Sequence, residues 1–205
     1  ITYNRGAFPE FDVIYRGEKI GHVVLNIPGR HNVANALSVI AVAIENGVPM
    51  ELIEKNITGF KGAGRRFEII GEFEGITIAD DYAHHPREIA AALSSIRESY
   101  PDMKLTAAFQ PHLYTRTRDF APEFAEALSN VDKLILLEIY PAREEPIPGV
   151  TSEIIFKDVT APEKVLLRRD EFMDYMKNEP VELLVTLGAG DIDRFVPEIA
   201  QMLSR

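Results

Sequence analysis

The stretch Ile76-Thr77-Ile78-Ala79-Asp80-Asp81-Tyr82-Ala83-His84-His85-Pro86 decides the fold class of this sequence. Its first four residues form a short β-branched run, which predicts a buried strand. From Arg87 to Ser99 the apolar residues recur at helical spacing, which predicts a helix. The residues from Asp80 to Pro86 therefore form a turn from a strand into a helix, and Pro86 suits the first helical position.

The same alternation of strand and helix continues to the end of the chain. Further strands are expected at residues 67–70, 75–79, 104–109, 133–139, 164–167 and 181–187, and helices at 86–99, 115–128, 151–157, 169–177 and 191–203. Regular alternation of this kind predicts an α/β fold with a mostly parallel, doubly wound sheet.

The first 64 residues have a different pattern. A β-hairpin is expected around Arg16-Gly17-Glu18-Lys19, followed by helices at 33–46 and 50–60, with Gly47 as the C-cap of the first. The glycine-rich stretch at 58–66 predicts a domain boundary and a hinge. We therefore divide the sequence into residues 1–64 and residues 65–205.

Composition narrows the class of protein. The 205 residues are 46% hydrophobic and carry a formal net charge of -10, which argues against nucleic acid or an anionic membrane as a partner. Cysteine is absent, so the chain has no disulfide framework and no thiolate metal site. This composition is compatible with a reducing cytoplasm. No apolar run approaches the roughly 18 residues of a membrane span. The chain begins at Ile1 without an initiator methionine, which predicts a piece of a longer protein, and its oligomeric state is left open.

The turn after residue 79 concentrates titratable groups. Asp80, Asp81, Tyr82, His84 and His85 follow a predicted parallel strand, and open parallel sheets bind ligands at the carboxyl ends of their strands. The alternative is a capped turn in which one aspartate accepts helix amides and the histidines are solvated. Five such groups in seven residues favour a ligand site.

A second turn of the same kind runs from Phe109 to Arg118. It also lies between a strand and a helix, so we expect His112 and Arg116 to face His84 across a crevice. Thr115 or Thr117 is expected to cap the helix. Arg118 and Asp119 are interpreted as a surface pair.

Four other features are candidates with an open alternative. Asn32 and Asn35 lie three apart and suit an adenine edge, or Asn32 is only an N-cap. Arg65 and Arg66 suit phosphate or carboxylate recognition, or are solvated. Gly188-Ala189-Gly190 is a weak phosphate signal, with Asp193 where a third glycine would stand, and a tight turn is the safer interpretation. Residues 143–149 form either a lid or a surface crossing.

Together and in this order, these stretches resemble the Mur ligase family. The resemblance runs over nearly all of residues 20–195 and rests on Gly29 to Leu37, Arg65 to Glu68, Asp80 to Pro86, Phe109 to Thr117 and Gly188 to Ile192. It implies that residues 1–64 are the tail of a central ATPase domain and that 65–205 are a Rossmann-like, amino-acid-binding domain. No Gly-x-x-x-x-Gly-Lys-Ser/Thr loop occurs in the sequence, so the phosphate loop and the main Mg²⁺ ligands are expected elsewhere.

The resemblance also implies an activity. Asp80 to Pro86 paired with Phe109 to His112 is similar to the alanine-adding branch, in which ATP activates UDP-N-acetylmuramate as an acyl phosphate that L-alanine attacks, a step of peptidoglycan synthesis. The cofactors are then ATP and Mg²⁺, the enzyme is cytoplasmic, and this chain alone is expected to be inactive. The alternatives are a murein-peptide recycling ligase, a non-catalytic nucleotide-binding or docking domain, and an oxidoreductase using Gly188 to Gly190.

The family's site residues carry over to the matching positions. Asn32 and Asn35 would contact adenine. The rest of the nucleotide site would be formed by Arg66, Asp81 and Tyr82. The amino acid would be bound by His84, His112, Tyr114 and Arg116. Of these, His84 and Arg116 would be catalytic. No metal ligand is assigned in this chain. Leu113 departs from the pattern, because the family often has arginine there.

Overall fold

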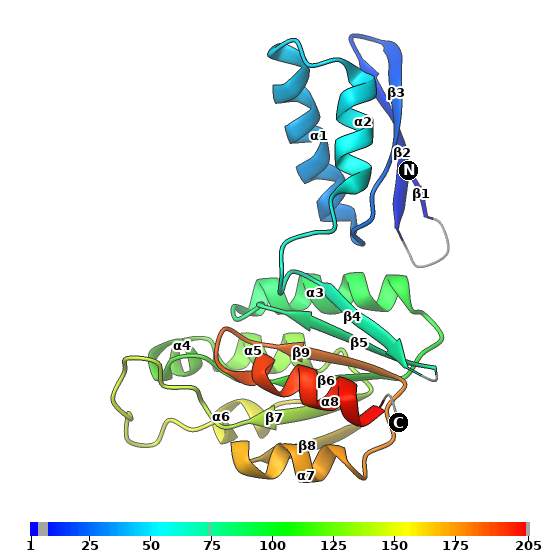
Figure 1. Cartoon of the computed structure of the whole chain (residues 1–205). Coiled ribbons are helices and arrows are strands. Elements are labelled where there is room, and N and C mark those ends of the chain that lie inside the picture. The colour runs from blue at the N-terminus through cyan, green and yellow to red at the C-terminus, as the bar shows by residue number, and fades with distance from the viewer. Residues whose placement is uncertain (4–7, 74, 204–205) are drawn as a thin grey trace. The chain divides into compact units, whose positions relative to one another are not determined.

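The computed structural model describes residues 1–3, 8–73 and 75–203 (Figure 1). It divides into two compact units. One comprises Ile1–Gly64 together with Ser95–Pro101, and the other comprises Arg65–Ser94 and Asp102–Arg205. No helix within the described ranges is long and apolar enough to cross a membrane.

The first unit contains an antiparallel sheet and two helices. Its elements are β1 (Thr2–Tyr3), β2 (Pro9–Tyr15), β3 (Glu18–Val24), α1 (Arg30–Glu45) and α2 (Met50–Gly59). The predicted hairpin is present, with Arg16 and Gly17 at φ of 52° and 90° in the turn between β2 and β3. Apolar residues of the hairpin and both helices, including Phe11, Val23 and Ile40, form its core.

Two details of α1 correct the sequence prediction. The helix begins at Arg30, three residues early, because Gly29 adopts the non-helical cap conformation. Asn32 therefore lies inside the first turn and is not the N-cap. At the other end the cap is Asn46, and Gly47 follows it with a φ of 76°, the left-handed conformation that glycine favours.

The second unit is built on a six-stranded sheet in the order β4-β5-β9-β6-β7-β8. Only β4 is antiparallel to its neighbour, so the predicted mostly parallel sheet is confirmed. The strands are β4 (Glu68–Phe73), β5 (Ile76–Asp81), β6 (Leu105–Phe109), β7 (Lys133–Leu137), β8 (Glu163–Leu167) and β9 (Leu183–Leu187). The carboxyl ends of β5, β9 and β6 lie next to one another at one edge.

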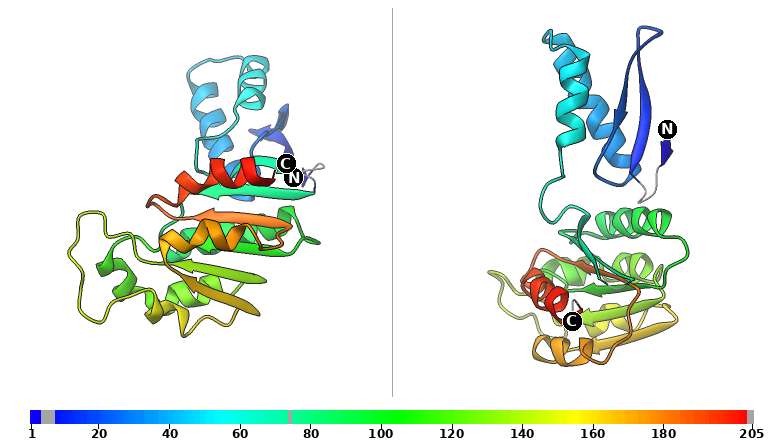
Figure 2. Two further views of the ribbon diagram at one scale, coloured as in Figure 1. Left: turned by 60° about the horizontal axis from the view of Figure 1, so that its bottom comes forward. Right: turned by 45° about the vertical axis from the view of Figure 1, so that its right-hand side comes forward.

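Helices cover both faces of this sheet (Figure 2). They are α3 (Pro86–Ser99), α4 (Tyr114–Asp119), α5 (Ala121–Leu128), α6 (Glu153–Phe156), α7 (Phe172–Met176) and α8 (Val196–Leu203), with 3₁₀ turns at Arg169–Glu171 and Ile192–Phe195. On one face, α7 and α8 pack Phe172, Met176 and Ile199 against buried strand residues such as Ile135. On the other, α3 and α5 bury Ile89, Leu93, Phe124 and Leu128.

The predicted helix bounds are right for α3, too long for α6, which covers only Glu153–Phe156, and wrong for the three other predicted segments. Residues 115–128 form two helices that meet at Phe120, because Pro122 lacks an N–H and its ring disfavours a continuous helix. The segments predicted at 169–177 and 191–203 each begin as a 3₁₀ turn before the α-helix. The break at Phe120 matters most, because it makes α4 a separate short helix after β6.

Candidate functional site

The first candidate turn starts two residues later than the sequence indicated. Strand β5 continues through Asp80 and Asp81, which pair with Thr186 and Leu187 of β9. Both aspartates are buried, with exposed fractions of 2% and 8%. Their charges therefore need partners inside the fold.

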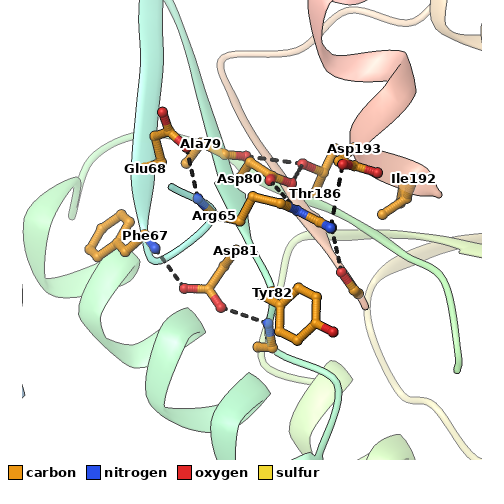
Figure 3. Close-up of polar contacts among 12 residues, drawn as sticks. Arg65, Phe67, Glu68, Ala79, Asp80, Asp81, Tyr82, Thr186, Ile192 and Asp193 are labelled. Carbon is orange, nitrogen blue, oxygen red and sulfur yellow. Dashed lines mark hydrogen bonds and ion pairs between the residues drawn. The ribbon is translucent and has the colours of Figure 1, made fainter. Parts of the chain in front are cut away.

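Asp80 is held by an ionic network that contains Arg65 (Figure 3). Its carboxylate accepts Arg65 Nε at 3.0 Å and the Thr186 hydroxyl at 2.5 Å. Arg65 also donates to the Gly188 carbonyl at 2.6 Å and lies 3.4 Å from Asp193. Burial raises the pKa of Asp80, and Thr186 and Arg65 oppose that rise. Arg65 is thus committed to the fold, a role the sequence analysis missed.

Asp81 ties the start of β4 to the turn. One carboxylate oxygen accepts the N–H of Phe67 and the other that of Ala83, each at 2.7 Å (Figure 3). The Tyr82 N–H donates to the Arg65 carbonyl at 2.7 Å. Burial raises the pKa of Asp81, whereas the two amides lower it. These bonds hold Arg65 and Phe67 at φ of 58° and 47°, an uncommon conformation for residues other than glycine.

Neither aspartate caps α3, so the capped-turn alternative is wrong for both. The carboxylate of Glu88, in the first turn of α3, accepts the N–H groups of His84 and His85 at 3.1 and 3.3 Å. The aspartate oxygens are bonded elsewhere, those of Asp80 to Arg65 and Thr186 and those of Asp81 to the N–H groups of Phe67 and Ala83. The Arg66 guanidinium lies 5.4 Å from the centre of the Tyr82 ring. Among the described residues, Arg66 has no hydrogen bond or ion pair, so its guanidinium is available to bind an anion.

The second turn brings His112 close to His84, as predicted. Their ring centres are 6.2 Å apart, and His112 also stacks on Tyr140 at 5.7 Å with the rings 19° from parallel. The Nδ1 atom of His84 lies 2.9 Å from the Tyr82 carbonyl. A carbonyl can only accept, so Nδ1 carries the hydrogen and Nε2 of neutral His84 is left as an acceptor.

Two buried nitrogens of this cluster have no partner. They are His112 Nδ1 and Arg116 Nη1, the buried side-chain polar atoms without a hydrogen bond among the described residues. Burial, followed by the positive charge of Arg116, lowers the pKa of His112. Buried polar atoms are almost always hydrogen-bonded, because leaving one unpaired costs about 1–3 kcal/mol. A guanidinium beside a neutral imidazole is therefore suited to an anionic ligand such as a carboxylate.

The remaining groups of the second turn differ from expectation. The Thr117 hydroxyl donates to the Leu113 carbonyl at 2.8 Å, and the Thr115 hydroxyl donates to Glu144, so neither threonine caps α4. Tyr114 lines a cavity of about 540 Å³ with Glu138 and Arg168, whereas His84, His112 and Arg116 do not line it. Arg118 and Asp119 form an exposed pair at 2.7 Å, as predicted.

The turn after β9 is closed by the side chain of Gln110. A Cβ on Gly188 would lie 2.8 Å from the Gln110 carbonyl, and one on Gly190 would lie 2.3 Å from Gln110 Oε1. Gln110 also bonds Asp191 and the N–H of Ile192. The tight-turn interpretation is confirmed, because Gln110 packs closely against both glycines.

The two asparagines lie in the first unit. Asn32 Nδ2 donates to the Pro28 carbonyl at 2.7 Å, and Asn35 Nδ2 donates to Asn32 Oδ1 at 3.3 Å. They thus share one face of α1, as the spacing indicated. A contact with adenine stays a prediction.

The fold defines a class of protein, namely a doubly wound α/β domain, and this one brings His84, His112 and Arg116 together at the carboxyl edge of its sheet. The profile of the family described as "Mur ligase, glutamate ligase domain" matches residues 65–190. The chain therefore belongs to the Mur ligase family, and the resemblance noted from the sequence is confirmed.

Named relatives support the same family. The chain is 45% identical to the UDP-N-acetylmuramate–L-alanine ligase of Parabacteroides distasonis and 46% identical to that of Porphyromonas gingivalis, over 95% and 92% of its length. It spans only 42% of either relative. The structure is similar to that of the UDP-N-acetylmuramate-alanine ligase of Thermotoga maritima, with a TM-score of 0.78 and 27% identity over 96% of this chain and 43% of that one.

Proposed function

We propose that the chain is part of an ATP-dependent ligase that joins L-alanine to UDP-N-acetylmuramate in peptidoglycan precursor synthesis. The observation that carries the proposal is the pair of buried, unpartnered nitrogens on His112 and Arg116 beside His84. The identity to alanine ligases over nearly the whole chain supports it.

In this proposal the amino acid binds between the two turns. Arg116 pairs with the carboxylate of L-alanine, because a guanidinium forms strong charge-assisted bonds with carboxylates. Nε2 of His84 accepts a hydrogen bond from the amine of L-alanine and takes its proton as the amine attacks the carbonyl carbon of the acyl phosphate, which breaks the carbon–oxygen bond to the phosphate and releases phosphate. His112 is kept neutral by burial and by the charge of Arg116. It therefore adds a hydrogen bond to the amino acid without a second positive charge that would compete with Arg116 for the carboxylate.

For the nucleotide, we propose contacts residue by residue. Arg66 binds a phosphate of ATP, since it has no polar partner in the described part of the chain, and Tyr82 and Asp81 lie beside it. Asn32 and Asn35 are proposed for adenine on sequence grounds. Among the described residues, no group of three or more His, Cys, Asp or Glu side chains is placed to hold a metal ion. We place the principal Mg²⁺ and phosphate ligands outside this chain, which alone should not turn over.

The test compares Arg116→Ala with Arg118→Ala in the complete ligase. Both arginines lie on α4, but Arg118 is exposed and pairs with Asp119. Loss of a charge-assisted bond to the substrate carboxylate should raise the KM for L-alanine roughly 30- to 1000-fold, with little change in the KM for ATP. Arg118→Ala should change neither value. An Arg116→Ala enzyme with both KM values raised equally, or with neither raised, would refute the assignment.

A further inference from the structure

Helix α4 carries Arg116 but lacks an N-cap side chain of its own. Its N-cap residue is Leu113, which makes no side-chain hydrogen bond to the helix and has a φ of 74°. That left-handed conformation costs a residue other than glycine roughly 1–2 kcal/mol. Bonds from elsewhere in the fold must therefore hold this turn in place.

The loop after β7 supplies those bonds. The Leu113 N–H donates to the Tyr140 carbonyl at 3.0 Å, and the Tyr140 N–H donates to the Pro111 carbonyl at 2.8 Å. Four residues later, Glu144 reaches the first turn of α4, where its carboxylate accepts the Thr115 N–H at 2.9 Å and the Thr115 hydroxyl at 2.5 Å. Glu144 thus caps a helix that lies 29 positions earlier in the chain.

This cap has a consequence for the neighbouring cation. Arg116 follows Thr115 directly, so the orientation of the first turn of α4 sets the direction of the guanidinium. The bonds from Thr115 lower the pKa of Glu144 and keep its carboxylate ionised. Those same bonds occupy both carboxylate oxygens of Glu144, and Arg116 Nη1 has no hydrogen-bond partner among the described residues.

We propose that Glu144 is a positioning residue for the amino-acid site. It fixes the first turn of α4 through Thr115, and so holds the guanidinium of Arg116 open toward the substrate carboxylate. This inference rests on the proposed function, because it assigns Arg116 the same ligand. Glu144 itself does not touch the substrate.

The experiment measures the KM for L-alanine and for ATP in the complete ligase with Glu144→Ala, Glu144→Gln and Glu145→Ala. Loss of a helix cap that orients the binding group should raise the KM for L-alanine roughly tenfold and leave the KM for ATP within about twofold. Glu144→Gln keeps one acceptor oxygen and should fall between. Glu145 is the matched control, since it is the adjacent residue, is exposed and has no bond among the described residues. Its variant should behave as wild type.

A double variant separates positioning from general damage. If Glu144 acts through Arg116, adding Glu144→Ala to Arg116→Ala should not raise the KM for L-alanine further. Multiplying effects, or equal rises in both KM values for Glu144→Ala, would overturn the inference. Failure of Arg116→Ala to affect L-alanine would instead refute the proposed function, so the two failures are distinguishable.

Discussion

Replacement of Arg65 by methionine tests the network around Asp80. Asp80 is 2% exposed, and Arg65 gives it a bond of 3.0 Å while also bonding the Gly188 carbonyl. Breaking a buried ion pair costs about 3–5 kcal/mol, because the remaining charge is left uncompensated. The Arg65 side chain is 24% exposed, so solvent reduces the loss to about 2–3 kcal/mol at neutral pH.

The pH dependence has a definite sign. Burial raises the pKa of Asp80 in the folded protein above its ordinary value, and removal of Arg65 raises it further. A raised pKa of a carboxyl means that stability falls as pH rises through the folded pKa and recovers as pH falls. The stability gap between wild type and Arg65→Met should therefore narrow toward pH 5, to about 1 kcal/mol for the lost bond to the Gly188 carbonyl.

The assay is urea unfolding of this chain followed by circular dichroism at pH 8 and pH 5. Arg66→Met is the matched control, since Arg66 is the next residue and has no ion pair in the described part of the chain; it should unfold like wild type. Adding Asp80→Asn to Arg65→Met removes the unpaired charge and should recover the stability at pH 8 except for about 1 kcal/mol from the lost bond to the Gly188 carbonyl. A gap of equal size at both pH values, or no recovery in the double variant, would refute this account of Asp80.

Two further outcomes follow from the site. Gly190→Ala should destabilise the chain by about 1–3 kcal/mol in thermal unfolding, because the new Cβ would lie 2.3 Å from the Gln110 oxygen that accepts the Ile192 N–H. Gly59→Ala is the control and should not destabilise the chain, because a Cβ there would meet nothing within 4 Å. Equal effects of the two variants would contradict the role of packing at Gly190. In an NMR titration, the pKa of His112 should lie below the ordinary value of about 6.5. It should rise in Arg116→Ala, because a neighbouring cation disfavours the imidazolium form. An unchanged pKa in this variant would show that Arg116 does not lower it.

Local patterns in the sequence were enough for the second unit's fold. The bounds of α3 could be predicted because Pro86 sets its start and Ile89, Leu93 and Ile96 repeat at helical spacing. The end of β5 could not, since Asp80 and Asp81 look like turn residues locally. What allows them inside a strand is a set of partners far away in the chain, Thr186 being 106 positions later.

Long-range partners also explain what was missed in the site. The sequence predicted that His84, His112 and Arg116 would lie near one another, because all three follow predicted strands that end at one edge of the sheet. It did not distinguish Arg65 from Arg66, because only the tertiary structure shows that the first is paired with Asp80 and the second is not. Glu144 gave no signal either, since its partner Thr115 lies 29 residues earlier and nothing local relates the two.

The charged side chains that stabilise the fold have partners, whereas one nitrogen of His112 and one of Arg116 have none among the described residues. Wherever a charge serves the fold, the chain supplies its partners: Asp80 with Arg65, Asp81 with two amides, and Glu144 with Thr115. Among the described residues, the buried side-chain atoms left without a partner are one nitrogen of His112 and one of Arg116. An unpaired buried polar atom lowers the free energy of unfolding, so these two nitrogens do not stabilise the fold. A ligand that completes the hydrogen bonds does account for them, and the carboxylate of an amino acid has the charge and size to do so.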